Sequence, residues 1–431
     1  MPSNAKPFAL SSRACRTRRQ PISGLMAQAV ENPDVISLAA GLVDDATLPT
    51  AEAADLLTAM LADTGAGRAA LQYGTTKGLL PLREALRAHL VHLDGWDPAH
   101  IAATPDDLVV ATGSQQLLFI LGDMLVDPGD VVIAGWPSYF VYTGTLEALG
   151  AEVRCVDVDD GGMVPEALEA LLGRLDAGGA LPRVKIVYVV SYHQNPTGIT
   201  LAGDRRERLL DIVRRYSRDH RILVIEDAAY RELTFEGAPP PSLKTYDPEN
   251  RDVALLATFS KTFSPGVKVG YGLLPRDLVE PVVLAKGNHD FGSANLCQHL
   301  VLRALETGVY QRHVKRLCRR YAEKRDAMLA ALQTHLGDLG PQVHWTHPTG
   351  GLYVFLTLPE AIETHSRSPL FARALEEGVL TVPGEYCYAA DPTRTVPQNT
   401  IRLSYGVCEP DRIRAGIAAL GRAVAHVLEN P

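Results

Sequence analysis

Two short apolar runs constrain the fold of this chain more than any other feature of its sequence. VKIVYVV at 184–190 and ILVIE at 222–226 are almost entirely apolar and mostly β-branched, as expected of strands that are covered on both faces. Between them, residues 205–220 show the period of an amphipathic helix. This order of strand, helix and strand predicts two parallel strands joined by a helical connection.

The same alternation continues from about residue 78 to residue 275. Helical patterns lie at 78–90 and 142–150, and further strand-like runs lie at 108–112, 131–134, 253–259 and 267–274. We therefore predict an α/β fold with a mainly parallel sheet. Ligands of such sheets bind at the carboxyl ends of the strands, so polar residues at those positions are candidates for a binding or catalytic role.

The remaining sequence predicts a second, smaller domain, because 431 residues exceed what one hydrophobic core usually holds. Residues 294–335 are helical, and residues 340–431 mix strand-like runs with two helical patterns, which is typical of an α+β domain. The predicted division is an N-terminal segment at 1–60 that belongs to the small domain, a large domain at 61–310 and a small C-terminal domain at 311–431.

Composition excludes several classes of protein. Lys plus Arg number 42 against 50 Asp plus Glu, so no basic excess favours nucleic-acid binding. The six cysteines form no CxxC pair, which favours reduced thiols over a disulfide framework or a zinc site. There is neither a run of about 18 apolar residues nor a secretory signal pattern. We expect a soluble, cytoplasmic protein without a membrane span.

Three polar residues follow buried strand-like runs, which marks them as candidates for chemistry. Lys261 lies in FSKTFSPGVKVGYG at 259–272, Asp227 ends a strand, and Asn195 lies in the turn-like segment SYHQNPTG. A buried amine is costly unless it becomes neutral or pairs, and one use of such an amine is a Schiff base with an aldehyde. Taken singly, each residue also fits a structural explanation: an exposed loop lysine, a helix N-cap and a turn.

A second set of residues would suit an aromatic, phosphorylated ligand. A buried carboxylate needs a cationic partner, which a protonated pyridine nitrogen would provide for Asp227. Asn195 would then donate to a phenolic oxygen on the same ring, and Tyr230 shares a face with Asp227 three residues earlier. Gly113-Ser114-Gln115 opens a helix after a strand, where free N–H groups favour a phosphate.

Seven ordered landmarks make the combination specific. They are Tyr73-Gly74, Gly113-Ser114-Gln115, Pro137-Ser138-Tyr139, Asn195-Pro196-Thr197-Gly198, Asp227-Ala228-Ala229-Tyr230, Ser260-Lys261 and Ile401-Arg402-Leu403-Ser404. The chain resembles pyridoxal 5'-phosphate (PLP) enzymes of fold type I, specifically class I/II aminotransferases. VISLAAGL at 35–42 and QNPTG look most like the branch with α-aminoadipate and kynurenine aminotransferases. The resemblance implies a three-layer αβα large domain.

The resemblance also implies a role for each matching residue. The implied catalytic residues are Lys261, which holds the cofactor as a Schiff base and moves protons, Asp227 and Tyr230. The implied cofactor contacts are Ser114, Gln115, Tyr139, Asn195, Asp227, Tyr230, Ser260, Lys261, Lys268 and Tyr73. Tyr73 would reach the phosphate of a neighbouring subunit, which implies a homodimer with shared active sites. The implied substrate contacts are Arg402, which would clamp the α-carboxylate, together with Asn195 and Gly41.

Two parts of the sequence fit the family pattern less closely. The family usually carries arginine where this chain has Lys268, and lysine keeps the charge but loses the two-pronged geometry. The N-terminal stretch 11–45 is a candidate for substrate recognition through Gly41 and its arginines, although it also fits a plain docking segment. Those arginines are Arg13, Arg16, Arg18 and Arg19.

The function expected from these residues is transfer of the amino group of an α-amino acid to a 2-oxo acid, 2-oxoglutarate or pyruvate, with ping-pong kinetics. A PLP-dependent lyase, cyclase or oxidase on the same fold is the alternative. An aminotransferase-like effector domain of a transcription regulator is disfavoured by the acidic charge and by the early position of VISLAAGL, since such regulators place a winged helix first. A nicotinamide dehydrogenase is disfavoured because no G-x-G-x-x-G follows a strand.

Overall fold

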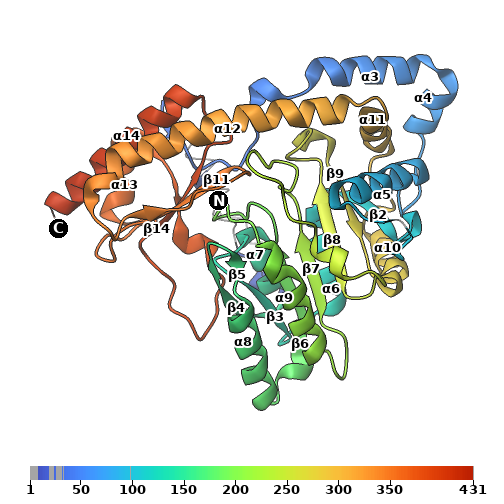
Figure 1. Cartoon of the computed structure of the whole chain (residues 1–431), viewed down its shortest axis with the longest axis horizontal. Helices are drawn as coiled ribbons and strands as arrows, with labels where there is room; N and C mark the ends of the chain where they lie inside the picture. The colour runs from blue at the N-terminus through green and yellow to red at the C-terminus, as the bar shows by residue number, and fades with distance from the viewer. Residues whose placement is uncertain (1–7, 19–23, 26–31, 33, 98, 431) are drawn as a thin grey trace, which may run out of the picture.

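The computed structural model describes residues 8–18, 24–25, 32, 34–97 and 99–430, and within them it shows one large sheet and a smaller antiparallel sheet (Figure 1). The large sheet has eight strands. In spatial order they are β2 (Leu108–Thr112), β9 (Val269–Leu273), β8 (Val253–Thr258), β7 (Leu223–Asp227), β6 (Val184–Val190), β3 (Val131–Trp136), β4 (Glu152–Asp159) and β5 (Gly162–Met163). Neighbours from β8 to β4 pair in parallel, whereas β9 runs antiparallel to both β2 and β8.

Helices cover both faces of this sheet, which confirms the three-layer α/β fold. Leu117, Leu146 and Val282 place α6 (Ser114–Leu125), α7 (Phe140–Leu149) and α10 (Arg276–Asp290) in the core on one face. The other face is covered by α5 (Leu80–Asp94), α8 (Pro165–Ala177), α9 (Gly203–Tyr216) and α11 (Asn295–Glu306). Within β6, Tyr188 packs on the first face and Val189 on the second, which explains why the whole strand is apolar.

The smaller sheet is built mainly from the C-terminal part of the chain. Its order is β10 (His344–Trp345), β11 (Tyr353–Thr357), β14 (Thr400–Ser404) and β13 (Val382–Pro383), and all pairs are antiparallel. Near it, β1 (Ile36–Ser37) pairs in parallel with β12 (Val379–Leu380). The helices α12 (Val309–Leu336), α13 (Pro369–Glu376) and α14 (Pro410–Glu429) share its hydrophobic core.

The elements outside these two assemblies are short or N-terminal. They are α1 (Ser12–Arg16), α3 (Thr50–Ala62), α4 (Thr64–Leu71) and the 3₁₀ turns η1 (Asp45–Thr47), η2 (Pro105–Asp107), η3 (Leu181–Arg183), η4 (Leu243–Tyr246), η5 (Pro265–Val267), η6 (Gly337–Leu339) and η7 (Gly384–Cys387). In the part of the chain that the structure describes, no helix has the length and apolar character needed to cross a lipid bilayer.

Several element boundaries differ from the sequence pattern for local reasons. The helical run predicted at 294–335 is two helices, α11 and α12, because Gly308 adopts a left-handed conformation (φ 69°) between them. The last strand of the large sheet starts at Val269 rather than at residue 267, because Lys268 also has a positive φ (51°) after a 3₁₀ turn. That turn follows the loop that carries Lys261.

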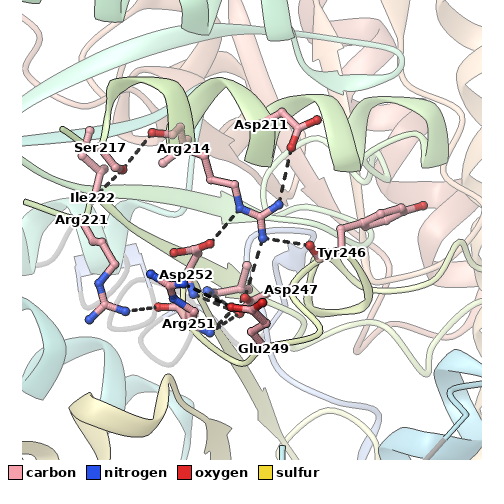
Figure 2. A network of polar contacts seen from close by, with 12 residues as sticks. Asp211, Arg214, Ser217, Arg221, Ile222, Tyr246, Asp247, Glu249, Arg251 and Asp252 are labelled. Carbon is pink, nitrogen blue, oxygen red and sulfur yellow. Dashed lines mark hydrogen bonds and ion pairs between the residues drawn. The ribbon is translucent and has the colours of Figure 1, made fainter. Parts of the chain in front are cut away.

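A polar network surrounds the first residues of β8, at the end of the strand that lies away from Lys261 (Figure 2). Arg214 of α9 donates to Asp252 at 2.8 Å and to the Tyr246 carbonyl at 3.0 Å. Asp247 accepts from the backbone N–H of Val253 at 3.0 Å and from the buried Lys244 ammonium at 2.8 Å. These contacts satisfy buried polar groups beneath the strand that leads to Lys261, and they lie away from the cavity described next.

Candidate active site

A cavity of about 300 Å³ opens at the carboxyl ends of the central strands. Its lining includes the residues that end β2, β6, β7 and β8: Thr112, Val190, Asp227 and Thr258. Nine of the twelve residues singled out by sequence line this cavity. They are Ser114, Gln115, Tyr139, Asn195, Asp227, Tyr230, Ser260, Lys261 and Lys268. Parallel strands place their carboxyl ends at one edge of the sheet, which explains why residues far apart in sequence meet here.

Asp227 is a buried carboxylate at the floor of the cavity. The strand register sets it opposite Val190 of β6, and the Tyr188 hydroxyl, two residues earlier on β6, donates to its Oδ2 at 2.8 Å. The backbone N–H of Ala229 donates to Oδ1 at 3.2 Å. Burial raises the pKa of Asp227 to about 6, although these two hydrogen bonds act to lower it. A carboxylate in this position is stabilised by a cationic ligand group.

Lys261 projects into the same cavity from the loop after β8. Its Nζ donates to the Gly41 carbonyl at 2.7 Å. Burial lowers the pKa of Lys261, and the charges of Arg402 and Lys268 lower it further. An amine with a lowered pKa is more often neutral at physiological pH, and a neutral amine can add to an aldehyde.

Asn195 and Tyr230 stand between Asp227 and the small sheet. Asn195 is buried, and its Oδ1 accepts from Nη1 of Arg402 at 3.1 Å. The Tyr230 hydroxyl lies 3.3 Å from the Tyr353 hydroxyl, and burial raises the pKa of Tyr230. Both side chains are neutral hydrogen-bonding groups that can meet an oxygen on a ring held in the cavity.

Arg402 on β14 lies behind the cavity lining rather than on its surface. It is buried, donates to Asn195 and also donates through Nη2 to the Ala39 carbonyl at 2.8 Å. Its guanidinium carbon lies 5.4 Å from the Phe140 ring centre and 4.7 Å from that of Tyr353. Among the described residues its Nε has no hydrogen-bond partner, so the side chain keeps a free donor for an anion.

An anion-binding arrangement forms the other end of the cavity. Ser114 is the first residue of α6, and Gly113 before it has a left-handed φ of 73°. Ser260 lies 2.9 Å from Thr258, hydroxyl to hydroxyl, and Lys268 adds an exposed ammonium. Hydroxyl groups, a helix N-terminus and a cation suit a phosphate.

Other candidates lie away from the cavity surface. Tyr73 is 83% exposed and packs edge-on against Phe291 at 5.6 Å, facing outward in this single chain. Gly41 is not a lining residue, but its carbonyl accepts from Lys261. Arg13 pairs with Asp123, so that arginine is engaged on the outer helices.

The other N-terminal arginines that the structure describes do not line the cavity, and neither does His193, a titratable side chain of the SYHQNPTG segment. Arg16 donates to the carbonyls of Ala148 and Leu149 at the end of α7, Arg18 is exposed, and Arg19 lies outside the described residues. His193 is buried between two threonine hydroxyls, at 2.8 Å from Thr234 and 3.1 Å from Thr200, and burial lowers its pKa to about 3.

Sequence reasoning missed several residues of the site. Thr112 and Thr258 end their strands just before segments that were singled out, so strand-end position is a usable signal for both. Leu42 comes from the N-terminal segment, and Tyr188 was read only as part of a buried strand. Leu42 ends the VISLAAGL segment, but that segment does not mark it as a lining residue, and no local signal marks Tyr188, because both roles depend on which elements pack together.

A model of the aminotransferase class I and II family matches residues 33–420. The chain belongs to this family. This aminotransferase is 33% identical over 401 residues to aromatic-amino-acid aminotransferase 1 of Thermococcus litoralis, which covers 93% of the chain and 90% of that relative. It is 34% identical over 400 residues to 2-aminoadipate transaminase of Thermus thermophilus, covering 92% of each. The solved kynurenine aminotransferase of Pyrococcus horikoshii, in complex with PMP, superposes with a TM-score of 0.87 at 33% identity, covering 97% of both chains.

Family membership implies PLP as the cofactor and PLP-dependent amino-group transfer as the activity of this aminotransferase. The residues present fit that group. PLP carries an aldehyde, a ring nitrogen, a phenolic oxygen and a phosphate, and the cavity offers an amine of lowered pKa, a buried carboxylate, two neutral hydrogen-bonding side chains and an anion-binding helix start. The unpartnered, buried Gln115 Oε1 at that helix start is a polar atom without a protein partner among the described residues.

Proposed function

We propose that this aminotransferase moves the amino group of an α-amino acid to 2-oxoglutarate or pyruvate by a ping-pong mechanism, in the cytoplasm. The observation that carries the proposal is that Lys261, of lowered pKa, and Asp227, a buried carboxylate, line one cavity of about 300 Å³. Amine and carboxylate are the two groups that the aldehyde and the ring nitrogen of PLP require.

Asp227 and Lys261 have different roles at the reacting centre. When bound, PLP accepts electron density from the Cα of the substrate. Asp227 holds a proton on the ring nitrogen through its carboxylate. Lys261 would hold the cofactor aldehyde through its amine, and its Nζ would be the group that takes a proton from the substrate Cα and returns it.

The surrounding side chains orient the cofactor. Asn195 and Tyr230 would donate hydrogen bonds to the phenolic oxygen, and Tyr139 would cover a ring face. Ser114, Gln115, Ser260 and Lys268 would hold the phosphate at the start of α6. Lys268 contributes a single point charge there, so this end binds the phosphate with less directional precision than an arginine would.

Substrate recognition joins the two sheets. Arg402 and Asn195 bind the α-carboxylate, since the guanidinium has an unpartnered N–H and the two side chains already contact each other at 3.1 Å. The segment that carries Gly41 contacts both Arg402 and Lys261, since Arg402 donates to the Ala39 carbonyl and Lys261 donates to the Gly41 carbonyl. The substrate site is therefore built jointly by the large sheet, the small sheet and the N-terminal segment.

A homodimer completes the site. Tyr73 and Phe291 present an exposed aromatic pair, and Leu71 and Leu284 are exposed nearby in sequence. These exposed apolar side chains are suited to burial against a second copy of the chain. In that dimer, Tyr73 of one subunit would reach the phosphate bound by the other. The domain division at 1–60, 61–310 and 311–431 remains part of this proposal.

The test is a donor panel with the purified holoenzyme. Aromatic amino acids, 2-aminoadipate, kynurenine, alanine and glutamate are each offered with 2-oxoglutarate or pyruvate, and the products are identified by mass spectrometry. Parallel lines in double-reciprocal plots are expected for a productive pair. Lys261→Ala should abolish turnover with an unchanged circular dichroism spectrum.

Other outcomes redirect or reject the proposal. Ammonia release without an oxo acid supports a lyase, and dioxygen consumption supports an oxidase. Cofactor binding without conversion of any amino acid argues for an effector-binding protein of the same fold. Failure to bind PLP at all rejects the proposed function.

A further inference from the structure

Tyr188 contacts the site from behind Asp227 and has no part in the chemistry described so far. It lies on β6 and is fully buried, and it does not line the cavity. Its hydroxyl donates to Oδ2 of Asp227 at 2.8 Å. A buried tyrosine hydroxyl normally has a partner, and here that partner is the carboxylate assigned to the ring nitrogen.

The strand register produces this contact. Val190 lies opposite Asp227 across the β6–β7 pair, and Tyr188 lies opposite Ile225. Side chains two residues apart on a strand share a face, so Tyr188 and Asp227 are diagonal neighbours on the face covered by α6 and α7. Rigid strands therefore hold both ends of the hydrogen bond.

The two oxygens of the Asp227 carboxylate accept from different donors. Oδ2 accepts from Tyr188, and Oδ1 accepts from the backbone N–H of Ala229 at 3.2 Å. Each carboxylate oxygen can accept two hydrogen bonds, so each keeps capacity on its cavity side. The two donors together fix the plane of the carboxylate relative to the cavity.

A neighbouring tyrosine shows that burial alone does not explain the contact. Tyr142 of α7 is as fully buried as Tyr188, and the two ring centres lie 4.6 Å apart. Its hydroxyl has no hydrogen-bond partner among the described residues. Of two adjacent buried tyrosines, only Tyr188 is bonded to the carboxylate.

We propose that Tyr188 is a positioning residue that keeps Asp227 ionised and oriented, so that the ring nitrogen of the bound cofactor stays protonated. This inference rests on the proposed function. A hydrogen bond from a neutral donor stabilises the charged form of a carboxylate, and the effect is strong where water is absent. Without Tyr188 the proton shared by Asp227 and the ring nitrogen shifts toward the carboxylate.

The electrostatics of the pocket are consistent with this role. Burial raises the pKa of Asp227 to about 6, and the Tyr188 bond is the largest effect that opposes the rise. Glu226 on β7 raises it further, although that side chain is paired with Arg206. Tyr139 and Tyr142 are the other titratable side chains whose pKa values respond to Asp227. Removing one donor therefore acts on a carboxyl group whose pKa is already raised above its ordinary value.

The experiment compares Tyr188→Phe with Tyr142→Phe, a control matched in chemistry, depth and position. Apo proteins are titrated with PLP by equilibrium dialysis, and the ¹⁵N chemical shift of ring-labelled PLP is measured in each holo protein at pH 8. Tyr188→Phe should weaken PLP binding about ten-fold, as expected for loss of a hydrogen bond to a charged group. Its ¹⁵N resonance should move toward the value of an unprotonated pyridine. Tyr142→Phe should change neither quantity.

Two further variants keep the test decisive. In an Asp227→Ala background, Tyr188→Phe should have no additional effect on PLP affinity, because the carboxylate through which it acts is gone. If Tyr188→Phe fails to fold, 3-fluorotyrosine at position 188, a stronger donor of nearly equal size, should move the ¹⁵N resonance toward the protonated value.

Several results would overturn the inference. An unchanged ¹⁵N shift and PLP affinity in Tyr188→Phe would do so, as would equal changes in Tyr142→Phe, or an effect that persists without Asp227. A wild-type protein that binds no PLP would reject the proposed function and this inference together. A wild-type protein that binds PLP normally beside an unaffected Tyr188→Phe would reject the inference alone.

Discussion

The floor and the rim of the cavity are built on different principles. The floor, formed by Asn195 and Asp227 with Arg402 and Tyr188 behind them, is buried, and each of these side chains is bonded to another part of the protein. The rim, formed by Thr112, Gln115, Ser260 and Lys268, is partly or fully exposed and lies at a strand end, at a helix start and in loops.

This difference shows where the positions of polar groups must be fixed by protein partners. Charged groups at the floor lose their hydration, so they persist only with protein partners, and the strand register fixes those partners. The rim keeps access to water and can bind an anion with hydroxyls, backbone N–H groups and one exposed ammonium. We therefore expect substitutions at the floor to cost far more than substitutions at the rim, and the following tests order them by expected effect.

The largest effect is expected at Arg402. Arg402→Gln removes the charge that we propose binds the α-carboxylate, and it leaves Asn195 Oδ1 and the Ala39 carbonyl without their donor. Loss of one partner of a buried charge pair costs about 2–5 kcal/mol, so kcat/KM should fall by about a hundred-fold or more. The loss should be in KM for the amino acid, with PLP affinity changed by less than about two-fold. Steady-state kinetics and a PLP titration on the same preparation check both parts. A fall in kcat alone would argue against a carboxylate clamp.

A pH-dependent effect is expected at Asp227 in the cofactor-free protein. Its pKa is about 6 in the folded chain, above the ordinary value of 3.8, so ionising it costs stability. The stabilising contribution of the protonated form is complete below about pH 4 and is lost as the pH rises through 6. Asp227→Asn should therefore stabilise the apo protein at pH 8, by about 2 kcal/mol, and should have little effect at pH 4.

Urea unfolding of the two apo proteins at both pH values measures this effect, provided that each transition is two-state. If Asp227 pairs with the ring nitrogen as we propose, saturation with PLP should reverse the order at pH 8, because the cofactor would then stabilise the native wild type more than the variant. Equal stability of the two apo proteins at pH 8 would show that the floor carries no desolvation cost and would break the contrast with the rim.

The smallest effect is expected at the rim. Lys268→Arg restores a two-pronged cation at a left-handed backbone position (φ 51°), which lysine and arginine tolerate equally. PLP affinity should rise a few-fold, because hydrogen bonds between exposed charged groups contribute about 1 kcal/mol or less. The fluorescence change of the apo protein on adding PLP gives the affinity, and Lys268→Met serves as the charge-loss control. A hundred-fold gain in PLP affinity would show that substitutions at the rim have effects as large as those at the floor.

Much of the fold and the site was predictable from local sequence patterns. The strands at 108–112 and 184–190 match β2 and β6, and the residues that follow strands, Lys261 and Asn195, line the cavity as their positions indicated. The break in the long helical run was not anticipated, because a single glycine with a positive φ decides it. Apolar periodicity reports burial and element type, and it carries little information about where an element stops.

What the sequence by itself determined is the alternation of strands and helices, and with it the edge of the sheet at which the polar residues collect. Tertiary structure alone decided which of them touch. The Lys261 bond to Gly41 joins residues 220 positions apart, and the Arg402 bond to Asn195 joins residues 207 positions apart. The pairing of Tyr188 with Asp227 depends on the register of two strands. Periodicity is set within a few residues, whereas such contacts exist only once separate elements have packed together.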